Sequence, residues 1–247
     1  MAESEKNQAE GCTSADLRTW AVAYELLALS LRYPTLELAE AVASGEWAEA
    51  AAEVAGALGL VLPDGWDEGL DEYAGWNPEA LLHALRAEAT RLFVGAPEPA
   101  VSPYEGVQRA ADDGVQALLF VNPHSMAVER FMRSCGLGRP EGTNEPLDRV
   151  DTELEFLQYL CMLEAGMAAA PGSAEPPARS ETAGGPDTPA GRALGNPAGS
   201  WAATHKRFLE EHALTWMPRF ADRVAEEARE PFYRVAAGLL KAVLEKA

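Results

Sequence analysis

Two short stretches combine residue types that could recognise a basic ligand. One covers residues 102–106 and reads SPYEG, and the other begins at Asn144 and reads NEPLDR. Carboxylates such as those of Glu105, Glu145 and Asp148 can each hold a guanidinium group through two parallel hydrogen bonds. Both stretches also place acids and rigid prolines at the ends of predicted helices, where a helical bundle can expose a groove. They are therefore candidate recognition sites.

A simpler interpretation of the second stretch is that it only starts a helix. Asp148 would be the N-cap, and Glu145 and Asp151 would complement the helix dipole, which together stabilise a helix by about 1 kcal/mol. Capping is favoured on local grounds, although it leaves Asn144 and Arg149 unexplained. The recognition interpretation predicts that Asp148→Ala weakens partner binding more than it lowers stability.

The motifs of familiar catalytic and nucleotide-binding sites are missing from the sequence. It contains no GxxxxGK[ST], GxSxG or HExxH, and its three cysteines include no CxxC pair. His205 and His212 lie seven residues apart on one predicted helix face, but two histidines alone seldom form a metal site. Acid pairs such as Glu210 and Glu211 are most simply surface charge. The sequence therefore predicts a protein without catalytic residues, metal or cofactor.

Composition narrows the classes of partner. The chain has 247 residues and a formal net charge of −19, so it should repel nucleic acid and anionic lipid and attract basic partners. It contains no run of 18 apolar residues that could span a membrane. Its polar, acidic start lacks the basic and apolar regions of a secretory signal, so we expect a cytoplasmic protein without stable membrane insertion.

The periodicity of apolar residues predicts helices along most of the chain. One helical face runs from Leu17 to Leu31 and should end at Pro34, and the pair Asn122-Pro123 is typical of a helix start. A later helix carries Trp216, and Pro218 should kink or break it. The short apolar run at 115–121 is interpreted as a further helix.

Two regions have the composition of disordered chain. Residues 1–12 are polar, and residues 168–199 are mostly Ala, Gly, Pro, Ser and Glu without an aromatic residue. We therefore expect one all-α domain over 13–247, a bundle of about eight to ten helices interrupted by a flexible insertion at 168–199.

Several motifs, taken in order along the chain, resemble the TorD/DmsD family of NarJ-like chaperones. They are EATRLFVG, SPYEG, NEPLDRVDTELEFL, EEHALTWMPRF and EPFYRVAAGLL. The family usually has histidine where this chain has Arg149. Arginine stays protonated, whereas histidine titrates near neutral pH, so only a role in holding an acid such as Asp148 would survive the change. The insertion is also longer than in the family.

The resemblance implies an all-helical cytoplasmic chaperone that is not an enzyme. Its partner would be the catalytic subunit of a molybdopterin-containing oxidoreductase, bound through the N-terminal twin-arginine signal peptide or another segment until the cofactor is inserted. We expect acids to hold the basic part of such a peptide and apolar residues to line a groove for the rest. The expected binding residues are Leu92, Phe93, Tyr104, Glu105, Asn144, Glu145, Pro146, Asp148, Arg149, Trp216 and Tyr233.

Two alternatives from other classes remain open on the sequence. One is an enzyme that binds a nucleotide or small molecule in the same cleft, and the other is a helical adaptor unrelated to redox enzymes. The chain could act as a monomer or, by domain exchange through the insertion, as a dimer.

Overall fold

The computed structural model describes residues 14–114, 122–139, 144–170 and 196–247. Within these ranges the chain forms ten α-helices and no β-strand, which confirms the predicted all-α fold. The predicted disordered start, the predicted helix at 115–121 and most of the predicted insertion lie outside the described residues. The described residues at the two ends of the predicted insertion, 168–170 and 196–200, are not helical.

The helices are mostly between two and five turns long. The α-helices are Ser14–Leu31 (α1), Leu36–Ser44 (α2), Glu46–Leu58 (α3), Pro78–Ala89 (α4), Glu105–Asp112 (α5), Pro123–Ser134 (α6), Val150–Glu164 (α7), Trp201–Phe208 (α8), Leu214–Glu227 (α9) and Pro231–Lys246 (α10). A 3₁₀-helix, η1, covers Leu70–Tyr73, and two π-helical segments cover Thr90–Val94 (η2) and Leu209–Ala213 (η3).

Polar caps set several helix starts where the sequence predicts them. The side chain of Asn77 accepts hydrogen bonds from the backbone N–H groups of Glu79 and Ala80, and Pro78 occupies the first turn of α4. Asn122 caps α6 in the same way, with Pro123 following it. Proline suits this position because the first N–H groups of a helix have no partner within the helix.

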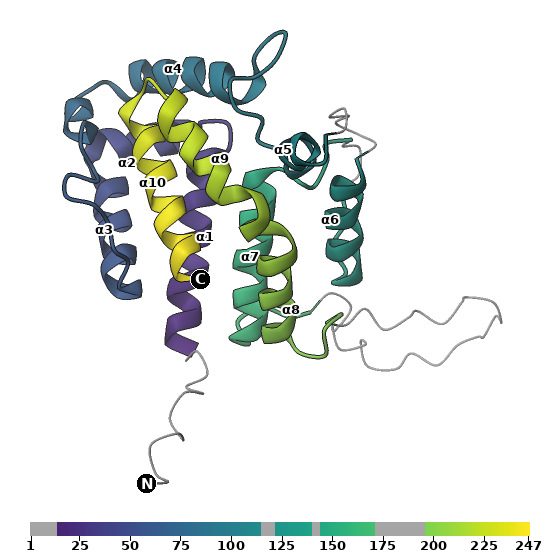
Figure 1. Cartoon of the computed structure of the whole chain (residues 1–247). Coiled ribbons are helices and arrows are strands. Elements are labelled where there is room, and N and C mark those ends of the chain that lie inside the picture. Colours follow the sequence, from purple (N-terminus) through teal and green to yellow (C-terminus); the bar gives the residue numbers. More distant parts are fainter. Residues whose placement is uncertain (1–13, 115–121, 140–143, 171–195) are drawn as a thin grey trace, which may run out of the picture.

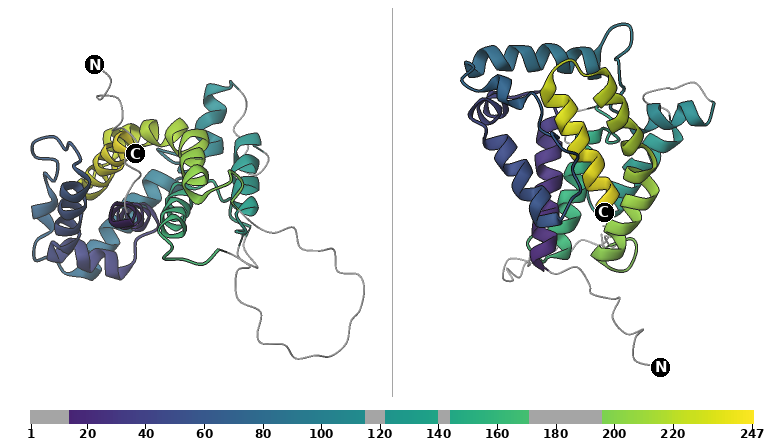
Figure 2. Two further views of the ribbon diagram at one scale, coloured as in Figure 1. Left: turned by 90° about the horizontal axis from the view of Figure 1, so that it is seen from below. Right: turned by 60° about the vertical axis from the view of Figure 1, so that its left-hand side comes forward.

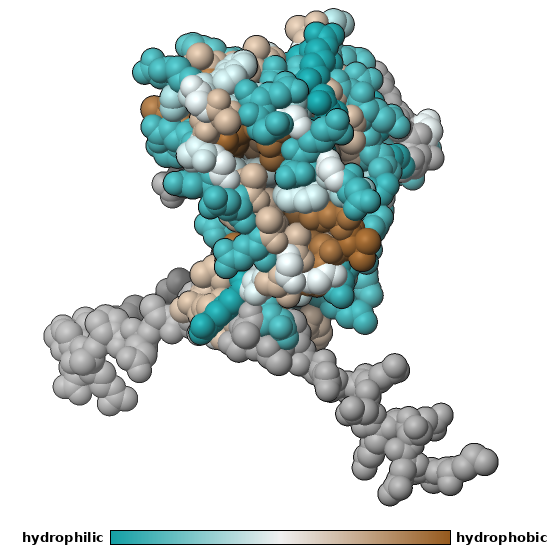
Figure 3. Space-filling model, turned by 90° about the vertical axis from the view of Figure 1, so that its left-hand side faces the viewer, coloured by the Kyte–Doolittle hydropathy of each residue, from teal (hydrophilic) through white to brown (hydrophobic). Residues whose placement is uncertain are grey.

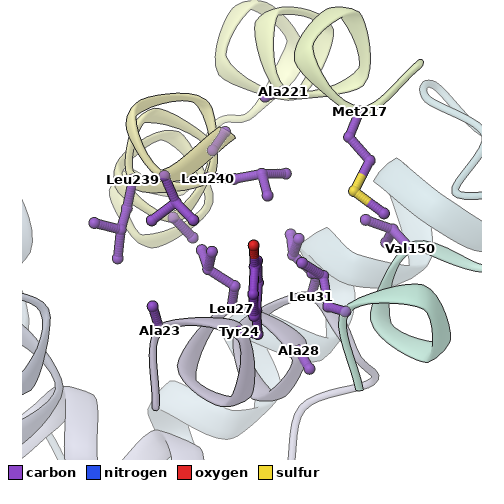
Figure 4. Packing of buried hydrophobic residues seen from close by; sticks show 14 of the residues in the cluster. Ala23, Tyr24, Leu27, Ala28, Leu31, Val150, Met217, Ala221, Leu239 and Leu240 are labelled. Atoms are coloured by element: carbon purple, nitrogen blue, oxygen red, sulfur yellow. The ribbon is translucent and has the colours of Figure 1, made fainter. Parts of the chain in front are cut away.

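α1 lies at the centre of the molecule (Figure 1) and packs against α3, α7 and α10. α2 and α3 lie on one side of it, α4 crosses its upper end, and α5 and α6 lie on the other side, next to α9 and α7. Two further views show the same arrangement (Figure 2). In the core, side chains of α1 point toward α10, α9 and α7 (Figure 4); those labelled from α1 are Ala23, Tyr24, Leu27, Ala28 and Leu31.

The helical run from α8 to α9 continues through Pro218 instead of ending there. The run bends between α8 and α9 (Figure 1), and the π-helical segment η3 lies between them. A π turn is a common origin of such a bend. The bend therefore lies at η3, ahead of Pro218, and the predicted break at Pro218 is wrong. His212 lies in η3 and is buried.

Candidate functional site

The two candidate stretches run antiparallel to one another at one end of the bundle. The N–H of Glu105 donates to the carbonyl of Asp148 at 2.8 Å, and the N–H of Val150 donates to the carbonyl of Pro103 at 2.9 Å. Tyr104 and Arg149 form the bridge between them. We call this contact between residues 102–106 and 144–151 the motif junction.

Asp148 is the central hydrogen-bond acceptor of the motif junction. Its side chain is buried, with Oδ2 accepting from the N–H of Gly106 at 2.9 Å and Oδ1 accepting from the hydroxyl of Ser125 at 2.8 Å. Burial raises the pKa of Asp148, and these two donors oppose the rise. Asp148 therefore fastens the first turns of α5 and α6 to the start of α7.

Gly106 is favoured at this place because its neighbours leave little room for a side chain. A Cβ atom there would lie 3.0 Å from Oδ2 of Asp148 and 3.1 Å from the side chain of Asn122. Asn122 also donates from Nδ2 to the carbonyl of Gly106 at 2.7 Å. The glycine of the SPYEG stretch thus permits the close approach of α5 and α6.

The expected capping role of Asp148 is wrong. The N-cap of α7 is Arg149, and its side chain makes no capping hydrogen bond. The Asp148 side chain is turned toward α5 and α6 and therefore does not cap α7. Arg149 does not hold Asp148 either, since Nη1 lies 3.5 Å from Glu145 and Nε lies 3.2 Å from Asp151. Burial raises the pKa of Asp151 to about 6, with the charge of Arg149 opposing the rise.

Glu105 connects α5 to η3 through two basic groups. Its fully buried carboxylate lies 2.6 Å from Nη1 of Arg109 and 3.0 Å from Nδ1 of His212. A carboxylate only accepts hydrogen bonds, so Nδ1 of His212 carries the hydrogen in this contact. Arg109 also donates to the carbonyl of Glu211 at 3.2 Å.

Glu153 is an acid on the buried face of α7. Its Oε2 accepts from Nε1 of Trp216 at 3.2 Å, and no described residue places a donor against Oε1. Burial raises the pKa of Glu153 well above its ordinary value, and the charges of Glu105 and Asp148 and a hydrogen bond with Glu105 raise it further. We therefore expect Glu153 to keep its proton at neutral pH.

We expect Glu153→Gln to remove a pH-dependent cost of folding. Below the unfolded pKa of 4.5, Glu153 is protonated in both states, so variant and wild type should melt alike. As the pH rises above that value, the unfolded chain releases a proton that the folded chain keeps, so wild-type stability falls relative to the variant. At pH 8 the variant should melt higher by roughly a few degrees. Calorimetry at both pH values measures this, and a lower melting temperature for the variant at pH 8 would contradict a protonated Glu153.

The structure separates the expected binding residues into buried and accessible ones. Asn144 and Glu145 are exposed, and Tyr104 and Arg149 are partly exposed. The remaining seven lie in the interior in this conformation and line none of the cavities described below, so they support the surface without forming it. They are Leu92, Phe93, Glu105, Pro146, Asp148, Trp216 and Tyr233.

The apolar members of that buried set belong to the core. The ring of Phe93 lies 6.0 Å from that of Phe220 and 5.7 Å from that of Tyr233, and the Tyr233 hydroxyl donates to the carbonyl of Leu85 at 3.2 Å. Sequence reasoning did not assign Ser125, His212 or Glu153 to the site. Glu153 could have been predicted, because it lies three residues after Val150 and four before Leu157, at helical spacing on one apolar face.

The fold and the motif junction together define the class of protein. It is an all-α protein in which buried charged and polar groups hold helix ends together beneath a small accessible surface. Among the described residues, no group of three or more His, Cys, Asp or Glu is placed to hold a metal ion, and no helix is long and apolar enough to cross a membrane. No match is found among curated proteins.

Residues 60–222 match the nitrate reductase delta subunit family. This is more than half of the chain and includes both stretches of the motif junction, so the chain belongs to that family, as the resemblance implied. The members of the family are non-catalytic chaperones that assist the maturation of molybdenum-containing oxidoreductases. Membership therefore excludes both alternatives, the enzyme and the unrelated adaptor.

Proposed function

We propose that this chaperone acts in the cytoplasm and binds one segment of an unfinished catalytic subunit, its N-terminal twin-arginine signal peptide or another stretch, until the cofactor is inserted. The observation that carries this proposal is the family match over residues 60–222, which spans the motif junction. The formal net charge of −19 supports a basic segment as the ligand, because charge complementarity speeds encounter and orients the partner.

The accessible surface of the motif junction supports contact with such a segment. The hydroxyl of Tyr104 and the guanidinium of Arg149 both lie 3.5 Å from the carboxylate of Glu145. Hydrogen bonds at that distance are weak, and the Glu145 side chain is 59% exposed. An arriving guanidinium could therefore replace them with two shorter bonds. The exposed side chain of Asn144 lies beside this place.

The buried residues of the expected set would act on binding indirectly. Asp148 holds the backbone of the SPYEG stretch, and Glu105 holds α5 against η3, so both fix the position of Tyr104. A preformed surface reduces the ordering cost of binding a flexible peptide. Glu105 and Asp148 would therefore not contact the partner segment directly. They would hold in place the surface residues that do.

The proposal is tested by capture of the catalytic subunit. The tagged full chain and the catalytic subunit are expressed together in a strain that lacks the cofactor. The amount of subunit that co-purifies with the tagged chain is then measured. We expect the double variant Tyr104→Ala/Glu145→Gln to recover several-fold less subunit than wild type. Glu226→Gln, an exposed acid on α9, is the matched control and should recover the wild-type amount. Failure of the wild-type chain to capture the subunit would overturn the proposal, and unchanged capture by the double variant would exclude the motif junction as its site.

A further inference from the structure

Residues 33–85 carry a one-sided charge that the motif junction does not use. The segment contains eleven acidic residues and no lysine or arginine, so it holds −11 of the chain's formal net charge of −19. It forms α2, α3 and η1 and most of α4. α2 and α3 lie on the side of α1 opposite to α5 and α6, and α4 crosses the upper end of the molecule (Figure 1).

All eleven carboxylates face solvent, and none has a basic partner within 4 Å among the described residues. Elsewhere in the described chain, acids such as Glu105, Glu129 and Glu227 are paired with arginine. Figure 3 shows this side of the molecule as mostly hydrophilic, with apolar residues visible between the hydrophilic ones. The segment therefore presents a negative potential that attracts cations over a Debye length of about 10 Å, although Arg234 of α10 lines a cavity beside Glu68 and Glu72.

A cavity of about 530 Å³ lies in this acidic surface, between the α2–α3 junction and η1. Its floor is apolar and includes the buried side chains of Val42, Trp47 and Leu70, and its rim carries the exposed acids Asp67, Glu68 and Asp71. We call this cavity the acidic groove. Its volume falls in the range typical of ligand sites, about 300–1,000 Å³.

The floor and the wall of the acidic groove are fixed by the core. Nε1 of Trp47 donates to the hydroxyl of Ser30 at 2.9 Å, and its ring packs edge-on against that of Phe232 at 5.1 Å. On the other side, the hydroxyl of Tyr73 in η1 donates to Glu230 at 2.7 Å. One wall thus contacts α10 through Phe232, and the other contacts Glu230, the N-cap residue of α10. The groove is therefore preformed.

Gly69 allows the rim of the acidic groove to pack closely against the start of α10. Its φ of +89° is a left-handed conformation that favours glycine, and a Cβ atom there would lie 2.9 Å from the ring of Pro231. A second cavity of about 460 Å³ shares Gly65, Glu68 and Gly69 with the acidic groove. The acidic rim therefore lies between two hollows, which gives an extended ligand more than one place for a side chain.

We propose that the acidic groove is a second docking surface, and that its occupant is a segment of the client polypeptide that combines arginine or lysine with apolar side chains. Charge selects the basic residues, and the apolar floor accepts the aliphatic or aromatic ones. This inference rests on the proposed function, and it places a second basic segment of the client on the opposite side of α1 from the motif junction. The eleven unpaired acids exclude an anionic ligand.

The test is a titration of the full chain with a synthetic peptide that has two adjacent arginines before an apolar stretch, followed by fluorescence anisotropy. The groove variant is Asp67→Asn/Glu68→Gln/Asp71→Asn. The control variant neutralises three other exposed acids of the same segment that lie outside the groove, Glu40→Gln/Glu49→Gln/Glu53→Gln. We expect the groove variant to bind about tenfold more weakly, and the control to stay within about twofold of wild type.

Several results would overturn the acidic groove as the site. They are no binding to wild type, unchanged binding to the groove variant, and equal loss in both variants, which would mean diffuse attraction only. A wild-type dimer that the groove variant dissociates would instead assign the groove to a second copy of the chain. If the groove variant binds the peptide normally while wild type still captures the catalytic subunit, only the groove inference fails. If wild type binds the peptide but captures no subunit, the proposed function fails.

Discussion

Asp148→Ala is expected to lower the free energy of unfolding by about 2–4 kcal/mol. The change leaves the N–H of Gly106 and the hydroxyl of Ser125 buried without their acceptor, and each unsatisfied donor costs about 1–3 kcal/mol. The raised pKa of Asp148 shows that burying its charge is itself unfavourable, which offsets part of the loss. Thermal unfolding followed by circular dichroism should show a fall of roughly 5–15 °C.

Two further variants serve as comparisons for Asp148→Ala. Asp148→Asn keeps one acceptor oxygen and should fall between wild type and alanine. Asp222→Ala removes only an exposed ion pair with Lys241 and should change the melting temperature little. The sequence alone suggested that Asp148→Ala would affect binding more than stability, and burial reverses that order. A variant with wild-type stability and lost client capture would restore the original view.

Glu105→Ala is expected to destabilise the chain by a similar amount, about 2–4 kcal/mol. Removing one partner of a buried ion pair typically costs 3–5 kcal/mol, and the 25% exposure of the Arg109 side chain reduces that figure, because water can solvate it. His212 is left buried without an acceptor for Nδ1. Chemical denaturation of the variant against wild type measures the loss.

A double-mutant cycle separates the His212 contact from the rest of this loss. The ring of His212 packs against Phe208 and Phe131, with centroids 4.9 Å and 5.7 Å away, so phenylalanine fits the same place. Glu105→Ala/His212→Phe should therefore lose less stability than the two single variants added together. Strict additivity would show that Glu105 and His212 do not stabilise each other.

The local structure of this protein follows from its sequence to a large degree. Asn77-Pro78 and Asn122-Pro123 start α4 and α6, because a side-chain acceptor and a residue without an N–H satisfy the needs of a first turn. The spacing of apolar residues in α1 and α10 identifies the faces that meet in the core. Helix caps and amphipathic faces depend on neighbours a few residues away, so the sequence displays them directly.

The family also follows from the sequence, through short motifs in a fixed order. The structural role of the residues in these motifs could not be predicted from the sequence in the same way. The sequence placed Glu105 and Asp148 at the surface, because most acids are solvated, whereas each is buried beside donors from other helices. Leu92, Phe93, Trp216 and Tyr233 have the side chains of a binding groove, and the packing of η2, α9 and α10 encloses them.

The helices, the acidic balance and the family of this chaperone can all be read from the amino-acid sequence. Which acids support the motif junction from beneath, and which lie unpaired around the acidic groove, depends on the packing of the helices, because the donors that surround a carboxylate come from distant parts of the chain. Glu105 meets His212, 107 residues later, and Asp148 meets Gly106, 42 residues earlier. Residues so far apart in the chain come into contact only when the helices pack.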